Sequence, residues 1–135
     1  MTFPLEHGLN KASLPAILVN IFDYNICLLL DTGSNQNAID RRVYEHFIDR
    51  FTNQQKKQQN LETFYGTEAK AKANILFTLD NQEYEDFFIP TDIFPEIFDK
   101  VCNETGLRIH GILGNNFFLK YEWIIDFKNK EVYNN

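Results

Sequence analysis

Cysteine, glycine and proline are scarce in this chain of 135 residues, which contains 2 cysteines, 6 glycines and 4 prolines. The cysteines, Cys27 and Cys102, stand far apart and form no Cys-x-x-Cys pair, which excludes the usual thiolate metal motifs and a disulfide-rich scaffold. Two scattered cysteines favour reduced thiols, and therefore an intracellular, cytoplasmic protein, with a single disulfide as the open alternative.

Positive charge is also in short supply. Thirteen Lys and Arg residues face 19 Asp and Glu residues, for a net charge of −6, and no basic stripe is present. This balance argues against nucleic acid and against an anionic membrane as partners. No stretch approaches the 18 or more apolar residues of a membrane span, and the first seven residues lack the basic and apolar regions of a signal peptide.

Apolar and aromatic residues are plentiful, at 44% and 15% of the chain, and phenylalanine alone occurs 13 times. A chain of this length and composition can bury a core, and it predicts one domain over residues 1–135. Apolar runs with strand character dominate, and fewer stretches have helical spacing. The sequence therefore predicts a mainly β fold with two to three short helices.

The expected elements follow from apolar spacing and from turn residues. Residues 1–13 are expected to be an irregular lead-in, and the polar run 52–60 a solvated linker or a fraying helix end. Expected strands span 14–22, 25–30, 35–39, 75–79, 83–89, 109–113, 123–127 and 131–133, with a hairpin over 61–73 that turns near Gly66. Expected helices span 40–51, 92–105 and 116–121, capped by Asp40, Asp92 and Asn115, the second ending at Gly106.

The most informative stretch is Leu28-Leu29-Leu30-Asp31-Thr32-Gly33-Ser34, because it places a carboxylate at the end of an apolar strand. Burying a lone charge is unfavourable unless it is compensated, so such an aspartate indicates a shaped and partly dry site. A lone Asp-Thr-Gly is a weak signal. It is strengthened by a second element about eighty residues later, Gly111-Ile-Leu-Gly-Asn-Asn-Phe-Phe118, which opens a short helix.

Together the two motifs resemble the retroviral-type aspartic proteases, or retropepsins. Residues 29–34 are similar to the family's catalytic loop, and residues 111–118 to its second signature. The strand Ile124-Ile125-Asp126-Phe127 resembles cellular and bacterial members more than viral ones. The resemblance covers roughly residues 14–133, and it implies a closed antiparallel barrel-like β fold.

The resemblance also implies an activity, the hydrolysis of peptide bonds in a polypeptide substrate. That chemistry needs two carboxylates that share one proton. The chain supplies one in a suitable motif, Asp31, and is too short for two lobes. The second carboxylate is therefore expected from Asp31 of another subunit in a homodimer. Water is the co-reactant, and no metal or organic cofactor is needed.

Roles for the neighbouring residues are likewise implied by the resemblance. Thr32 is expected to bond across the dimer, Gly33 to let backbone approach the carboxylates, and Ser34 to bond the outer oxygen of Asp31. Ile112, Leu113 and Gly114 are expected to pack behind the catalytic loop and support it. Tyr65, Gly66 and Thr67 are expected at the tip of a flap that closes over the substrate.

The chain departs from viral members at Asn35 and Asn115, where many of those proteins carry an acidic residue and an arginine that help hold the dimer. One alternative is an idle retropepsin-fold module that dimerises or binds peptide without cutting it, and a weaker one is an aspartate-dependent hydrolase of another fold. His110, Cys27 and Asp126 are interpreted as structural residues, packed or in a turn.

Overall fold

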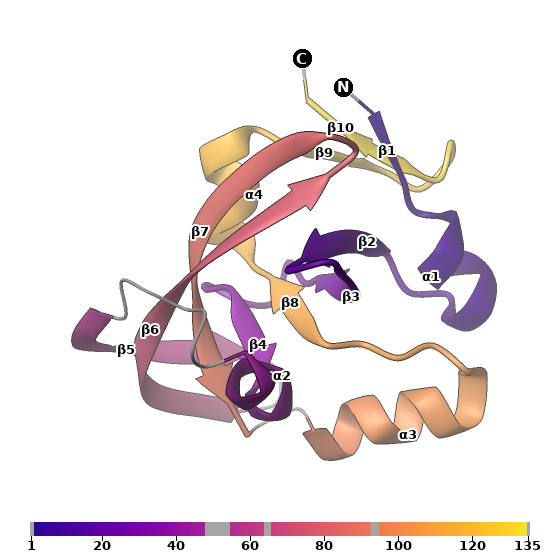
Figure 1. Cartoon of the computed structure of the whole chain (residues 1–135). Helices are drawn as coiled ribbons and strands as arrows, with labels where there is room; N and C mark the ends of the chain where they lie inside the picture. The colour runs from indigo at the N-terminus through magenta and orange to yellow at the C-terminus, as the bar shows by residue number, and fades with distance from the viewer. Residues whose placement is uncertain (1, 48–54, 64–65, 93–94, 135) are drawn as a thin grey trace.

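The computed structural model describes residues 2–47, 55–63, 66–92 and 95–134, with the backbone alone over 55–63 and 66–72 (Figure 1). These residues form four helices, one more than the upper limit expected: α1 (Glu6–Ala12), α2 (Arg41–His46), α3 (Pro95–Thr105) and α4 (Asn115–Tyr121). They also form ten strands: β1 (Thr2–Pro4), β2 (Ala16–Ile21), β3 (Tyr24–Leu30), β4 (Ala38–Asp40), β5 (Gln55–Thr63), β6 (Gly66–Leu79), β7 (Gln82–Thr91), β8 (Gly111–Leu113), β9 (Ile124–Asp126) and β10 (Glu131–Tyr133).

Six strands close into a barrel in the order β2-β3-β8-β4-β7-β6, and a pairing between Asn20 of β2 and Thr78 of β6 completes the ring. The expected closed, mainly β barrel is thus confirmed. The expectation of an antiparallel barrel is only partly right, because β3–β8 and β4–β7 are parallel. Parallel neighbours need long connections, and both pairs have them, since α2, β5 and β6 lie between β4 and β7 in the chain and these elements and others lie between β3 and β8.

The strand β3, which carries Asp31 at its end, is covered on both sides, as its continuous apolar sequence predicted. Leu28 and Leu30 belong to the larger core cluster inside the barrel. Cys27 belongs to a second cluster with Phe98 of α3, and the half-buried Leu29 packs against it. A strand held from two sides provides a rigid base for the residue that follows it.

The lead-in expected to be irregular contains regular structure over its described residues, 2–13. It forms β1 and α1, and β1 pairs with β10 in a small sheet of order β1-β10-β9 that places the two chain ends side by side (Figure 1). Phe3 is fully buried there and contacts the rings of Tyr84 and Trp123. The pairing joins residues more than a hundred positions apart, so no local sequence signal announced it.

Two further expectations about strands are wrong. The polar run 52–60 is not a linker over its described part, because β5 pairs with β6 from Gln55 onwards; residues 52–54 lie outside the described residues. The strand β7 does not stop before Pro90 but continues to Thr91. Proline is tolerated there because the preceding amide, that of Ile89, is the one that donates to the carbonyl oxygen of Asn37, just before β4.

The helix boundaries agree in part. Asp40 caps α2 as expected, since its carboxylate accepts the Arg42 N–H, while residues 48–51 of the expected helix lie outside the described residues. Asp92 is not the cap of α3, which begins only at Pro95; its carboxylate accepts from the Arg41 guanidinium instead. Gly114, and not Asn115, is the N-cap residue of α4.

Candidate functional site

Asp31 is the first residue of a loop over residues 31–34, here called the Asp31 loop. Its backbone N–H donates to the Leu113 carbonyl oxygen at 2.9 Å, which extends the β3–β8 pairing by one residue. Its carboxylate is half-buried, and Oδ1 accepts the Gly33 N–H at 2.9 Å. The carboxylate is therefore oriented by a backbone donor of its own loop. Among the described residues, no group donates a hydrogen bond to Oδ2.

Ser34 closes the loop but not in the predicted way. Its N–H donates to the Asp31 carbonyl oxygen at 3.2 Å, and the residue is buried. The hydroxyl donates to the Gln36 carbonyl oxygen at 2.7 Å. A hydroxyl has a single proton to donate, so the expected bond from Ser34 to the outer oxygen of Asp31 is wrong. The serine fixes the exit of the loop instead.

Asn115, at the start of α4, ties the second motif to the first. Its backbone N–H donates to the Ser34 carbonyl oxygen at 2.9 Å, and its side-chain Nδ2 donates to the Thr32 carbonyl oxygen at 2.6 Å. The side chain of Thr32 is exposed. The asparagine that departs from the viral pattern thus has a positioning role within one chain, which the sequence comparison with viral members did not reveal.

The second motif lies directly beside the Asp31 loop. Leu28, Leu29 and Leu30 of β3 pair in parallel with Gly111, Ile112 and Leu113 of β8. Ile112, Leu113 and Gly114 are all buried, so the structure brings the expected support residues together with Asp31. A side chain on Gly114 would bring its Cβ to 2.5 Å from the Gln36 carbonyl oxygen, which explains the need for glycine at this close approach.

Asn37 is a residue of the site that the sequence analysis missed. It is fully buried, its Oδ1 accepts the Gly114 N–H at 3.0 Å, and its Nδ2 donates to the Phe87 carbonyl oxygen at 3.2 Å. One amide side chain therefore satisfies two backbone groups on two different elements. The only sequence signal is a polar residue directly before an apolar strand, which is too common to single it out.

The flap candidates are only partly described. Gly66 pairs with Thr63 at the end of the β5–β6 ladder, and Thr67 pairs with Glu62, so the hairpin with Gly66 near its turn is confirmed. Tyr65 lies outside the described residues. In Figure 1 the hairpin projects from the barrel at the lower left.

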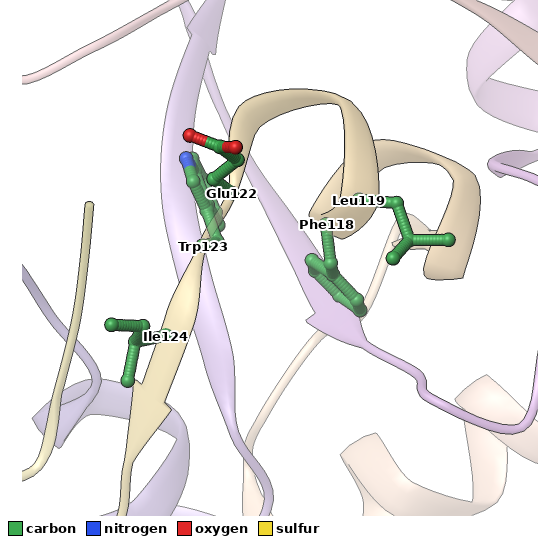
Figure 2. Close-up of a pocket in the computed structure, with 5 residues that line it drawn as sticks. All are labelled: Phe118, Leu119, Glu122, Trp123 and Ile124. Carbon is green, nitrogen blue, oxygen red and sulfur yellow. The ribbon is translucent and has the colours of Figure 1, made fainter. Parts of the chain in front are cut away.

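An apolar surface hollow lies farther along the helix that begins at Asn115. It has a volume of about 470 Å³, and Figure 2 shows α4 side chains on one side of it and residues of the turn and strand that follow on the other. We call this surface the α4–β9 face; it is lined by Phe118, Leu119, Glu122, Trp123 and Ile124. Leu119 is 79% exposed and Ile124 is 42% exposed.

Cys27, Asp126 and His110, interpreted from the sequence as packed or turn residues, have contacts of that kind among the described residues. Both cysteines are free thiols, and burial raises the pKa of Cys27 to about 12. Asp126, the last residue of β9, accepts hydrogen bonds from the backbone and side chain of Asn129, which lower its pKa and link it to the turn that follows. His110 is packed between strands. The described residues contain no cluster of three or more metal-binding side chains.

No helix in the described ranges is long and apolar enough to cross a membrane. No protein-family model matches the chain, and no curated protein matches it. What the chain does must therefore be argued from Asp31 and the groups that hold it.

Proposed function

We propose that the protein is an aspartic endopeptidase that acts as a homodimer, with Asp31 of each subunit activating one water molecule. The observation that carries this proposal is the setting of Asp31. The carboxylate follows a strand buried on both sides, its N–H is bound by Leu113, and its Oδ1 is oriented by the Gly33 N–H. This setting supports a catalytic carboxylate, because it combines a fixed backbone base with an outer oxygen, Oδ2, to which no described residue donates a hydrogen bond.

The proposed reaction uses two carboxylates that share one proton. The unprotonated carboxylate takes a proton from water, and the water oxygen bonds to the peptide carbonyl carbon. The protonated carboxylate gives its proton to the carbonyl oxygen, so a neutral tetrahedral diol forms. The diol then collapses with cleavage of the C–N bond: the departing nitrogen receives the proton held by the dyad, and a diol hydroxyl returns its proton to the dyad as the new carboxyl group forms. Water is the only co-reactant, and the substrate is a polypeptide.

The second copy of the chain is required because one subunit contributes a single Asp31. We infer that the copies meet across the exposed Thr32 and the α4–β9 face. Asn115 at the start of α4 bonds the Asp31 loop, and Leu119 lies four residues on, about 6 Å along the helix axis. An exposed leucine beside an apolar hollow is self-complementary, as a two-fold contact demands. The free thiols are compatible with the proposed cytoplasmic location.

The decisive experiment is a mixing titration of wild-type protein with Asp31→Asn, scored by cleavage of a peptide library under conditions of subunit exchange. If both aspartates are needed, activity follows the square of the wild-type fraction, so an equal mixture retains roughly one quarter of the activity of the same total amount of wild-type protein. Asp126→Asn is the control and leaves activity unchanged. A linear dependence on the wild-type fraction would contradict a shared site, and cleavage by pure Asp31→Asn would place the chemistry elsewhere.

The alternative of an idle peptide-binding module makes a different prediction in the same assay. Wild-type protein would then bind extended peptides and release them uncut, with no difference from Asp31→Asn in product formation. Product analysis by mass spectrometry separates the two outcomes.

A further inference from the structure

His110 joins three strands of the barrel. Its backbone N–H donates to the Cys27 carbonyl oxygen at 2.9 Å, and its own carbonyl oxygen accepts the Asp40 N–H at 2.8 Å. In addition, the imidazole Nδ1 accepts the Cys27 N–H at 2.9 Å. One residue thereby links β3, the start of β8 and the end of β4.

The imidazole replaces a missing backbone acceptor. The parallel pairing of β3 with β8 begins at Leu28 and Gly111, and the segment before Gly111 is not a strand. The Cys27 N–H therefore faces a point where the ladder has no carbonyl oxygen to offer. Because a buried N–H without an acceptor is unfavourable, Nδ1 must keep its lone pair, and the proton of the neutral ring resides on Nε2.

We propose that His110 is a positioning residue for Asp31: its neutral imidazole fixes β3 at Cys27, four residues before the carboxylate, and its protonation releases that strand. The inference rests on the proposed function for the importance of Asp31. It adds a lower limit of pH, below which the Asp31 loop is no longer held in position.

The surroundings favour the neutral ring. Burial lowers the pKa of His110, and the positive charges of Arg108 and Arg42 lower it further, while Asp40 opposes them. Asp40 is itself paired with Arg42 at 2.6 Å, and Asp99 of α3 binds both Arg42 and Arg108, so each of these two carboxylates is already paired with an arginine. On the β3 side the ring meets the Cys27 backbone N–H, and the Cys27 thiol is neutral because burial raises its pKa.

The sign of the pH dependence follows from this lowered pKa. Between the folded-state pKa and the unfolded value near 6.5, the unfolded chain binds more protons than the folded chain. The contribution of His110 to the free energy of unfolding is therefore fully present above about pH 6.5, and it falls as the pH drops towards the folded-state pKa of His110. Once the ring is protonated in the folded state, the bond to the Cys27 N–H is lost.

The first test compares wild-type protein with His110→Asn in urea unfolding at pH 7.5 and pH 5.5. Asparagine Oδ1 lies where Nδ1 lies and accepts the Cys27 N–H at both pH values. The urea midpoint of wild-type protein is expected to fall with pH, and that of His110→Asn to change much less. His7→Asn, which alters an exposed histidine, should retain the wild-type pH dependence. Equal pH dependence in wild-type protein and His110→Asn would overturn the inference.

The second test asks whether the titration reaches the Asp31 loop. The backbone amide signals of Asp31 and Gly33 in NMR spectra are expected to shift with the same midpoint as the His110 imidazole, and to lose that transition in His110→Asn. Amide signals that do not follow His110 would overturn the positioning role. Both measurements are made without a substrate and can be repeated in Asp31→Asn, so they stand or fall independently of proteolysis.

The third test uses cleavage, where the proposed function holds. On the acid side, wild-type kcat should fall about tenfold for each pH unit below the His110 pKa, with KM changing less. His110→Asn should shift this limb to lower pH while it retains kcat at neutral pH, and a limb that stays in place would contradict the inference. His110→Ala, which removes the acceptor, should lower kcat at every pH.

Discussion

The Asp31 loop and the α4–β9 face both adjoin α4, yet they differ in whether their exposed groups find partners within the chain. At the N-terminal end of α4, the polar groups of the loop bond to Leu113, Gln36 and Asn115 of the same chain. Farther along the helix, an apolar hollow opens to the surface beside the exposed Leu119. The position of the carboxylate is thus determined within one chain, while the neighbouring face leaves apolar surface exposed. Mutations that affect one region and spare the other test this difference.

The largest expected effect is on the loop side, from Asn37→Ala. The variant leaves the Gly114 N–H and the Phe87 carbonyl oxygen buried and unpaired, and it opens a small cavity. We expect a loss of about 3 kcal/mol in the free energy of unfolding, measured by chemical denaturation. A loss below about 1 kcal/mol would mean that the asparagine does not hold the second motif in place.

The next effect is expected from Gly114→Ala. The added Cβ would lie within 2.5 Å of the Gln36 carbonyl oxygen, so the loop exit must move. We expect a loss of about 2 kcal/mol in stability, together with loss of any peptidase activity. Gly106→Ala is the matched control, because its φ of +81° strains an alanine but the space around it is open. That variant should lose about 1 kcal/mol and keep its activity.

A smaller effect is expected from Asn115→Ala. The variant removes the bond from Nδ2 to the Thr32 carbonyl oxygen but retains the bond from the backbone N–H to Ser34. Stability should fall by about 1 kcal/mol, and amide exchange should accelerate within the Asp31 loop and not in β6. Uniform acceleration across the barrel would contradict a local role for this residue.

The smallest effect on folding, and the largest on association, is expected from Leu119→Ser on the α4–β9 face. Because Leu119 is 79% exposed, its replacement should change the free energy of unfolding of the single chain by less than about 0.5 kcal/mol. The dimer dissociation constant from sedimentation velocity should rise by about tenfold or more. Leu76→Ser alters an equally apolar exposed residue on β6 and should leave that constant unchanged.

Sequence reasoning predicted the parts of the fold that depend on neighbouring residues. The hairpin of β2 and β3, the Asp40 cap of α2 and the end of α3 at Gly106 all have local signals, and all are present. The errors concern partners distant in sequence. The pairing of β1 with β10 and the polar strand β5 owe their structure to partners that no local pattern reveals.

The candidate site shows the same division. The two motifs located Asp31 and the Ile112–Gly114 support, and the structure brings them together. The hydroxyl of Ser34 was misassigned because its acceptor, the Gln36 carbonyl oxygen, depends on how the loop exits. Asn37 and His110 act through backbone groups about fifty and eighty residues away, so composition and spacing had no means of identifying their roles.

The bond from Asn115 to Thr32 joins residues 83 positions apart, which has a consequence for the newborn chain. At a synthesis rate of about 5–20 residues per second, the ribosome needs roughly 4 to 17 seconds to add the residues between them. Until then the Asp31 loop lacks the acceptor at Leu113 and the donor at Asn115 that hold it in position. An emerging chain therefore carries Asp31 before the groups that hold its loop have been synthesised, so the loop reaches its final arrangement only late in translation.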